Sequence, residues 1–197
     1  MTEEKPTPLE GYEALLCLTG GIACYKVADL ASKLVQAGAG VTVAMTEAAT
    51  QFITPLTFQT LTCRPVYTSL WQATEAYEAG HLAPTKRADL MIIAPATANI
   101  IAKMAAGIAD DLVSSLALSA QGECPILIAP AMNTRMWEAP ATQANVQRLT
   151  QWGVQSIGPN VGFLACRTVG PGRMAEAREI LQAATGLLLK KPPKGRS

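Results

Sequence analysis

"LMIIAPA", residues 90–96, and "PILIAPA", residues 125–131, are the stretches that decide the fold. Each is a short and continuous apolar run, which is typical of a strand that is buried on both faces of a sheet. An amphipathic stretch follows each run, over residues 99–120 with a break at "GIADD" and over residues 140–152. A buried strand followed by a helix is the repeating unit of a parallel sheet.

The same rhythm continues toward both ends of the chain. Three more apolar runs, each with a helical stretch after or near it, are "ALLCLT" before residues 22–37, "VTVAM" before residues 46–53, and "VQSIGP" before residues 174–188. Strands that alternate with helices predict an α/β fold in three layers, with a Rossmann-like (flavodoxin-like) parallel sheet covered by helices on both faces.

The length and composition fit one domain. The chain has 197 residues, of which 49% are hydrophobic and 16% are charged, enough for one sizeable core and too little for two. We expect a flexible terminus over residues 1–12, the domain over residues 13–189 and a basic disordered tail over residues 190–197. Residues 61–86 are expected to be irregular except for a short helix at 73–79, and irregular segments of this length are often functional.

The charge balance and the cysteines exclude several classes of protein. With 16 Lys and Arg against 15 Asp and Glu, no net field attracts nucleic acid or an anionic membrane. The polar start predicts neither a secretory signal nor a transit peptide, and no apolar run is long enough to span a membrane, so we expect a cytoplasmic protein. Five cysteines without a CxxC pair and a single histidine, His81, favour neither a disulfide framework nor a zinc site, and no metal is expected.

Ligands of such folds gather where the strands end. After the first strand, Gly20 and Gly21 allow a tight turn at the start of a helix, where backbone N–H groups bind anions, although a simple turn explains the pair equally well. After the second strand, Thr46 stands where many dinucleotide-binding folds carry an acid for the ribose diol. A monophosphate shared with the glycine turn fits Thr46 better than a nucleotide diol does, and helix capping is the alternative.

The later strand ends carry hydrogen-bonding and apolar groups. Thr97 and Asn99 lie among small residues against which a flat heterocycle could lie, or they cap a helix. In "PAMNTRMW", residues 130–137, Asn133 offers an amide that suits a carboxylate or a ring carbonyl, beside the apolar surface of the methionines. The glycine-rich stretch 158–174 predicts a flap, and Cys166 near its middle is expected to be more exposed and more acidic than a strand cysteine.

Taken together, these blocks resemble the homo-oligomeric, flavin-containing cysteine decarboxylases, and among them most closely the phosphopantothenoylcysteine decarboxylases. The resemblance covers the chain from Leu15 to Met174. The blocks that carry it are "TGGIACYK", "MTEAATQFITP", "GHL", "APATANIIAKMAAGIADDL", "PAMNTRMW" and "GFLACRTVGPGRM".

The resemblance implies a function and a set of roles. It implies FMN-dependent oxidative decarboxylation of 4'-phosphopantothenoylcysteine to 4'-phosphopantetheine in coenzyme A biosynthesis, by a trimer or a dodecamer built from trimers, with a fused or separate synthetase as a partner. His81 would be the catalytic base, and Cys166 the proton donor. The remaining roles would be substrate binding by Asn133, Met132 and Met174 and FMN binding by Gly20, Gly21, Ile22, Thr46, Thr97, Ala98 and Asn99.

Two other functions stay open at this point. A peptidyl-cysteine decarboxylase that acts on a lantibiotic-type precursor shares His81, the "PAMNTRMW" block and FMN. A flavin-binding regulatory subunit without turnover is the second, and a missing catalytic residue would favour it. A flavin prenyltransferase fits less well, because its motifs lack the Asn133 role and the Cys166 flap.

Overall fold

The computed structural model describes residues 7–71 and 83–194 of the chain. Its centre is a six-stranded parallel sheet in the order β3-β2-β1-β4-β5-β6. The strands are β1 (Glu13–Leu18), β2 (Gly40–Met45), β3 (Val66–Tyr67), β4 (Leu90–Ala96), β5 (Ile126–Pro130) and β6 (Gln155–Ser156). This is the Rossmann order, whereas flavodoxin-like sheets share the layering but run 2-1-3-4-5. The expected three-layer Rossmann-like fold is confirmed.

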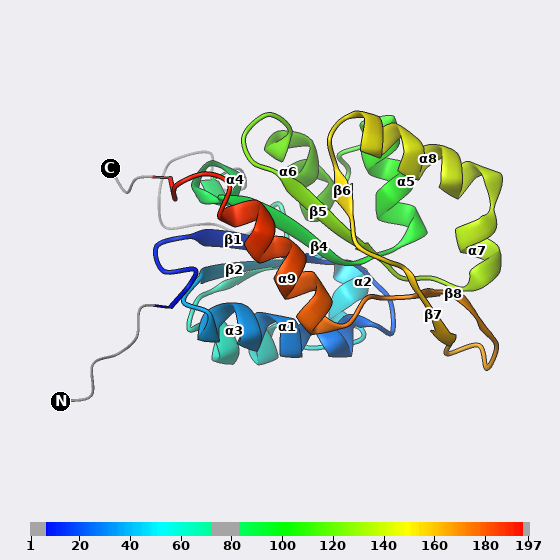
Figure 1. Cartoon of the computed structure of the whole chain (residues 1–197), viewed down its shortest axis with the longest axis horizontal. Helices are drawn as coiled ribbons and strands as arrows, with labels where there is room; N and C mark the ends of the chain where they lie inside the picture. Colours follow the sequence, from blue (N-terminus) through cyan, green and yellow to red (C-terminus); the bar gives the residue numbers. More distant parts are fainter. Residues whose placement is uncertain (1–6, 72–82, 195–197) are drawn as a thin grey trace.

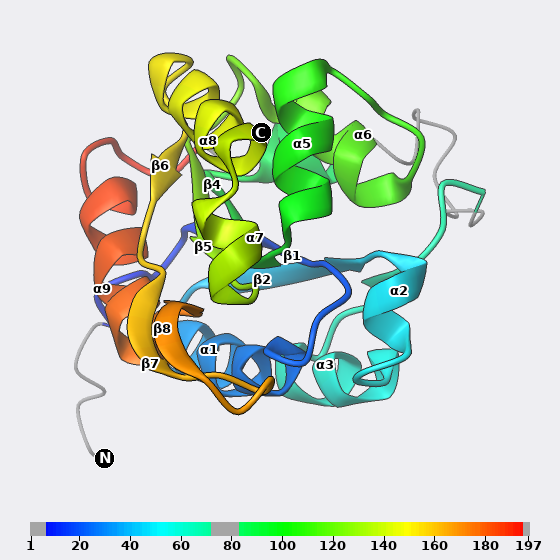
Figure 2. The ribbon, with the colours of Figure 1, turned by 90° about the vertical axis from the view of Figure 1, so that its right-hand side faces the viewer.

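Helices cover the sheet on both faces, as Figures 1 and 2 show. One face packs against α1 (Cys24–Gln36), α3 (Pro55–Thr62) and α9 (Ala177–Leu188). The other packs against α5 (Ala98–Ala106), α6 (Leu112–Ala120) and α8 (Pro140–Gln151), with α4 (Ala83–Arg87) beside α6. Because all six strands are parallel, their carboxyl ends lie at one edge of the sheet.

The alternation of side chains in β1 shows why these residues form a central strand. Leu16 and Leu18 belong to the core beneath α1 and α9, while Leu15 and Cys17 belong to the core beneath α5 and α6. All four side chains are fully buried. A strand with apolar residues toward both faces is stable only between two layers of helices, which is the position that β1 holds.

Several boundaries differ from the expected ones. The stretch 46–53 contains only a short helix, α2 (Glu47–Thr50), and α3 begins at Pro55, because proline is favoured in the first turn of a helix. The helix expected from residue 22 begins at Cys24, and the last helix begins at Ala177 after a capping box at Glu176. The short helix expected at 73–79 lies outside the described residues.

The two ends of the described chain pack against the domain. Leu9 is fully buried and its N–H donates to the carbonyl of Ala37, and Tyr12 Oη donates to the carbonyl of Lys191 at 2.9 Å. The backbone N–H of Lys194 donates to Asp89 at 2.7 Å. Residues from 7–12 and 190–194 therefore have contacts with the domain, while the expected flexible terminus and disordered tail stay predictions. The domain limits of 13 and 189 stay predictions.

The glycine-rich flap is an antiparallel hairpin. It consists of β7 (Asn160–Phe163) and β8 (Val169–Arg173), which form a sheet of their own. Figure 2, which looks onto the edge where the central strands end, shows this hairpin near α1 and α7 (Thr134–Glu138). Among the described helices, none is long and apolar enough to cross a membrane.

Candidate active site

A cavity of about 940 Å³ lies at the carboxyl ends of the central strands. Its walls come from the turns that follow β1, β2, β4 and β5, and from the β7–β8 hairpin. In a doubly wound sheet this edge is where ligands bind, since the chain diverges to opposite faces between β1 and β4. The cavity is large enough for a cofactor together with a small substrate.

The turn after β1 is tightly packed. A side chain at Gly20 would place its Cβ 2.5 Å from the Cβ of Ala48, so only glycine fits this approach of the turn to α2. Thr19, directly before it, is buried; its hydroxyl donates to the carbonyl of Pro95 at 2.6 Å and accepts the N–H of Thr97 at 3.2 Å. The exits of β1 and β4 are thereby joined into one rigid wall.

Thr46 and Thr97 both cap helices and both line the cavity. The hydroxyl of Thr46 accepts the N–H of Ala49 at 3.2 Å, and that of Thr97 accepts the N–H of Ile100 at 3.4 Å. The capping interpretation of both residues is therefore confirmed. It does not compete with ligand binding, because a hydroxyl that accepts a backbone N–H can still donate its own hydrogen.

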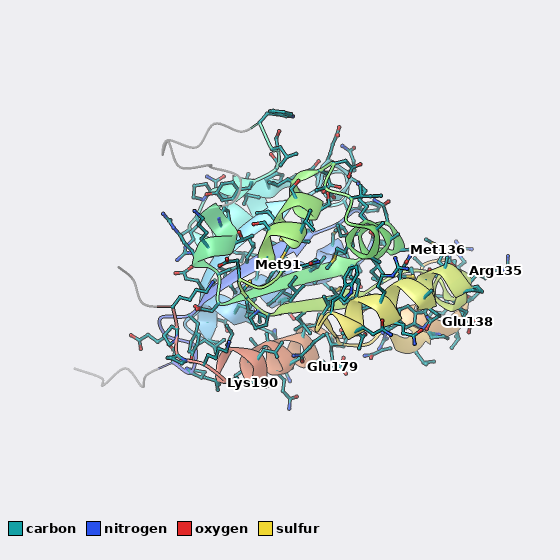
Figure 3. The ribbon with its side chains drawn as sticks, turned by 90° about the horizontal axis from the view of Figure 1, so that it is seen from above. Met91, Arg135, Met136, Glu138, Glu179 and Lys190 are labelled. Atoms are coloured by element: carbon teal, nitrogen blue, oxygen red, sulfur yellow. The ribbon has the colours of Figure 1, made fainter. Side chains whose placement is uncertain are left out.

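Asn133 holds its amide in one orientation. It is the N-cap of α7, and its side-chain Oδ1 accepts the N–H of Met136 at 2.8 Å. The oxygen is thereby used inside the protein, and the exposed Nδ2 amide is the group that can donate to a ligand. Figure 3 shows Arg135 and Met136 on α7, at the end of the molecule remote from Lys190.

Cys166 lies in the turn of the β7–β8 hairpin and lines the cavity. It is exposed, and its Sγ lies 3.1 Å from the hydroxyl of Thr168. The hydrogen bond with Thr168 is the main cause that lowers the pKa of this thiol below its ordinary value, and the charge of Arg135 contributes. Burial instead raises the pKa values of Cys17, Cys24 and Cys124.

The cavity brings together all the site residues predicted from the sequence that the structure describes. They are Gly20, Gly21, Ile22, Thr46, Thr97, Ala98, Asn99, Met132, Asn133, Cys166 and Met174. His81 lies outside the described residues.

The cavity also contains residues that the sequence did not single out. Thr19 precedes the glycine pair, and Phe163 and Arg173 belong to the hairpin strands. Lys26 and Lys103 come from α1 and α5. The position of Thr19 beside the glycine pair was a usable signal, but the two lysines look like ordinary polar positions of amphipathic helices.

The comparison with known protein families decides the assignment: the flavoprotein family matches residues 2–189. The chain belongs to the flavoprotein family. This flavoprotein is 47% identical over 176 residues to the coenzyme A biosynthesis bifunctional protein CoaBC of Bacillus subtilis (strain 168); this alignment covers 89% of the chain and 43% of the relative. It is 45% identical over 168 residues to the probable phosphopantothenoylcysteine decarboxylase of Streptococcus mutans; this alignment covers 85% of the chain and 94% of the relative.

Solved structures share the fold of this flavoprotein. A mutant PPC decarboxylase complexed with pantothenoylaminoethenethiol superimposes with a TM-score of 0.81 at 26% identity, over 92% of this chain and 100% of the other. The FMN-dependent cysteine decarboxylase SpaF superimposes with a TM-score of 0.78 at 29% identity, over 91% and 96%. The chain spans less than half of the bifunctional relatives it matches, and most of the Streptococcus protein.

Proposed function

We propose that this flavoprotein binds FMN in the cavity and decarboxylates 4'-phosphopantothenoylcysteine to 4'-phosphopantetheine, a step of coenzyme A biosynthesis. The observation that carries the proposal is the convergence on one cavity of residues from five separate segments, each predicted to bind FMN or substrate. The name of the Streptococcus relative points to the same reaction, and that of the Bacillus relative points to coenzyme A biosynthesis.

The residues present fit FMN. At Gly20 the turn is too close to Ala48 for a side chain, and the turn leads into the start of α1, where the backbone N–H groups of a helix suit a phosphate. At the exit of β2, where a dinucleotide fold would hold a ribose diol with an acid, the strand ends in Met45 and Thr46 follows it; the next residue, Glu47, begins α2 and also lines the cavity. Ala98 and Asn99 at the start of α5 form a small-residue wall for a flat ring.

Asn133 and Cys166 have different roles toward the substrate: Asn133 binds its carboxylate, and Cys166 donates a proton. The Nδ2 amide of Asn133 donates to the carboxylate that leaves as CO2, and so orients the bond that breaks. When bound, FMN supplies the oxidation and the later reduction, so that the overall reaction is redox-neutral. Cys166, with its lowered pKa, gives its proton to the decarboxylated enethiol product. We assign the base of the oxidation to His81.

The assembly and the partners belong to the same proposal. We propose a cytoplasmic homo-oligomer, either a trimer or a dodecamer built from trimers. Large apolar side chains are exposed near the cavity and on the neighbouring helices, and they are suited to an interface between copies: Ile22, Tyr25, Phe52 and Leu56. A synthetase, fused or separate, would act with this chain, as the bifunctional relatives suggest.

A comparison of two substrates tests the proposal. The purified protein is given 4'-phosphopantothenoylcysteine and, separately, a peptide that ends in cysteine, and CO2 release is measured. We expect a kcat/KM for the phosphorylated substrate that is at least a hundred times higher. A preference for the peptide would instead assign the chain to the peptidyl-cysteine decarboxylases, and bound flavin without release of CO2 from either would assign it to the regulatory subunits.

A further inference from the structure

Three positively charged side chains of the described residues line the cavity: Lys26, Lys103 and Arg173. Lys103 is fully engaged inside the protein, since its Nζ lies 2.6 Å from carboxylate oxygens of both Asp110 and Asp111. Those two carboxylates raise the pKa of Lys103. Its charge is therefore compensated before any ligand arrives, and the other two cations remain.

Lys26 and Arg173 share a single carboxylate oxygen. Lys26 Nζ lies 2.9 Å from Glu176 Oε1, and Arg173 Nη2 lies 3.4 Å from the same atom. A second carboxylate nearby, Glu179, accepts the backbone N–H of Glu176 at 2.7 Å and the side-chain amide of Asn160 at 2.8 Å. The negative charge of Glu179 also acts on Arg173 and Lys26, but among the described residues the carboxylate within ion-pair distance of these two cations is that of Glu176.

Arg173 has donors without acceptors. Within the described part of the chain, its Nε is buried without a hydrogen-bond partner. Its guanidinium contacts a carboxylate only through Nη2, at 3.4 Å from Glu176 Oε1, among the same residues. The side chain packs over Gly162, where an added Cβ would lie 3.0 Å from Nε. Because a buried donor without an acceptor is costly and a guanidinium carries five donors, this arrangement favours an additional anionic acceptor.

We infer that Lys26 and Arg173 bind the phosphate group of the substrate, while Asn133 binds its carboxylate; this rests on the proposed function. A phosphate has three acceptor oxygens, which match the planar fork of an arginine and the point charge of a lysine. The phosphate and the carboxylate are separate anionic groups of the substrate, and each then has its own partner among the cavity residues. A peptide substrate that ends in cysteine has no phosphate, and this pair therefore determines specificity.

A binding experiment separates the phosphate from the rest of the ligand. The flavin-loaded protein is titrated by calorimetry with 4'-phosphopantetheine and with pantetheine, which differ only in the phosphate and carry no carboxylate for Asn133. We expect the unaltered protein to prefer the phosphorylated ligand. Arg173→Gln and Lys26→Gln should each weaken its binding by about ten- to a hundredfold and leave pantetheine binding unchanged.

Arg178→Gln is the matched control, because Arg178 is an exposed arginine of α9 that does not line the cavity. It should change the binding of neither ligand. If Arg173→Gln proves unstable, Arg173→Lys retains the charge without the fork and should lose part of the preference for phosphate.

Three results would overturn the inference: an unaltered protein without preference for the phosphorylated ligand, variants that retain the preference, or variants that lose both ligands equally. The last result includes loss of the flavin itself. The proposed function is judged separately, by whether the unaltered protein releases CO2 from 4'-phosphopantothenoylcysteine. Turnover by a protein whose Arg173→Gln variant still prefers phosphate would refute this inference alone.

Discussion

Replacement of Asn133 by aspartate separates the helix cap that this side chain forms from the substrate-binding role that we propose for it. Its Oδ1 caps α7 by accepting the N–H of Met136 at 2.8 Å, and its Nδ2 is the donor that we propose toward the substrate. Aspartate is as good an N-cap as asparagine, so Asn133→Asp retains the cap and loses only the donor. Asn133→Ala loses both the cap and the donor, but it introduces no charge.

The structure predicts opposite orders for stability and for activity. Loss of the cap in Asn133→Ala costs about 1 kcal/mol, which lowers the Tm by about 2–4 °C for a domain of this size, while Asn133→Asp should leave the Tm nearly unchanged. Loss of a hydrogen bond to a charged group costs about 1.5–3 kcal/mol in both variants. Asn133→Asp adds repulsion between carboxylates of about 1 kcal/mol in water and about 4 kcal/mol at the lower dielectric of an occupied site.

The kcat/KM for CO2 release and the Tm are therefore measured on both variants. We expect kcat/KM to fall by about 10- to 150-fold for Asn133→Ala, and by at least a further fivefold for Asn133→Asp, the more stable variant. An aspartate variant that is the more active of the two, or a normal kcat/KM in both variants, would contradict the donor role of Asn133. Flavin content, measured by absorbance, should be the same in both.

Three further predictions concern the thiols and the first turn. Cys166→Ser should still release CO2 but accumulate a decarboxylated product two hydrogens short of 4'-phosphopantetheine. Cys17→Ser, in the buried core, is the control and should give the normal product. Mass analysis checks both, and a Cys166→Ser variant that forms mainly 4'-phosphopantetheine would show that Cys166 is not the acid. The fraction of complete product should fall as pH rises through a value below the ordinary thiol pKa, because only the protonated thiol donates and the pKa of Cys166 is lowered; a constant fraction up to high pH would contradict this. Gly20→Ala should lower the free energy of unfolding by about 1–3 kcal/mol and reduce flavin content, because its Cβ clashes with Ala48. Gly186→Ala, whose Cβ meets nothing within 4 Å, should instead stabilise α9 by up to about 1 kcal/mol. Unfolding of both variants by denaturant checks this contrast, and equal effects would refute it.

The sheet could be predicted from the sequence because its central strands are continuous apolar runs. β4 and β5 read as buried on both faces, and the structure buries every residue of each. β3 could not be predicted in this way, because its two residues, Val66 and Tyr67, are too few to show a period. The sequence signal for the start of α3 was Pro55, which lies just after the helix that we expected over residues 46–53.

The residues that line the cavity were predictable where one short segment carries its own sequence signal. The glycine pair, Asn133 and Cys166 each stand out within a few residues. Lys26 and Arg173 do not, because their relation depends on Glu176, which lies 150 positions after Lys26 and is brought to it by the packing of α1 against α9. The orientation of the Asn133 amide was equally hidden, since it depends on a cap whose geometry only the folded chain defines.

Anaerobic rapid mixing of the purified protein with 4'-phosphopantothenoylcysteine is the most direct test of the account. Flavin absorbance and released CO2 are followed in the same mixture. We predict that the oxidised flavin band decreases, that CO2 is released as it decreases, and that the band recovers as 4'-phosphopantetheine forms. Release of CO2 with no change in the flavin band, or a bound flavin that the substrate neither bleaches nor converts to product, would contradict the central claim.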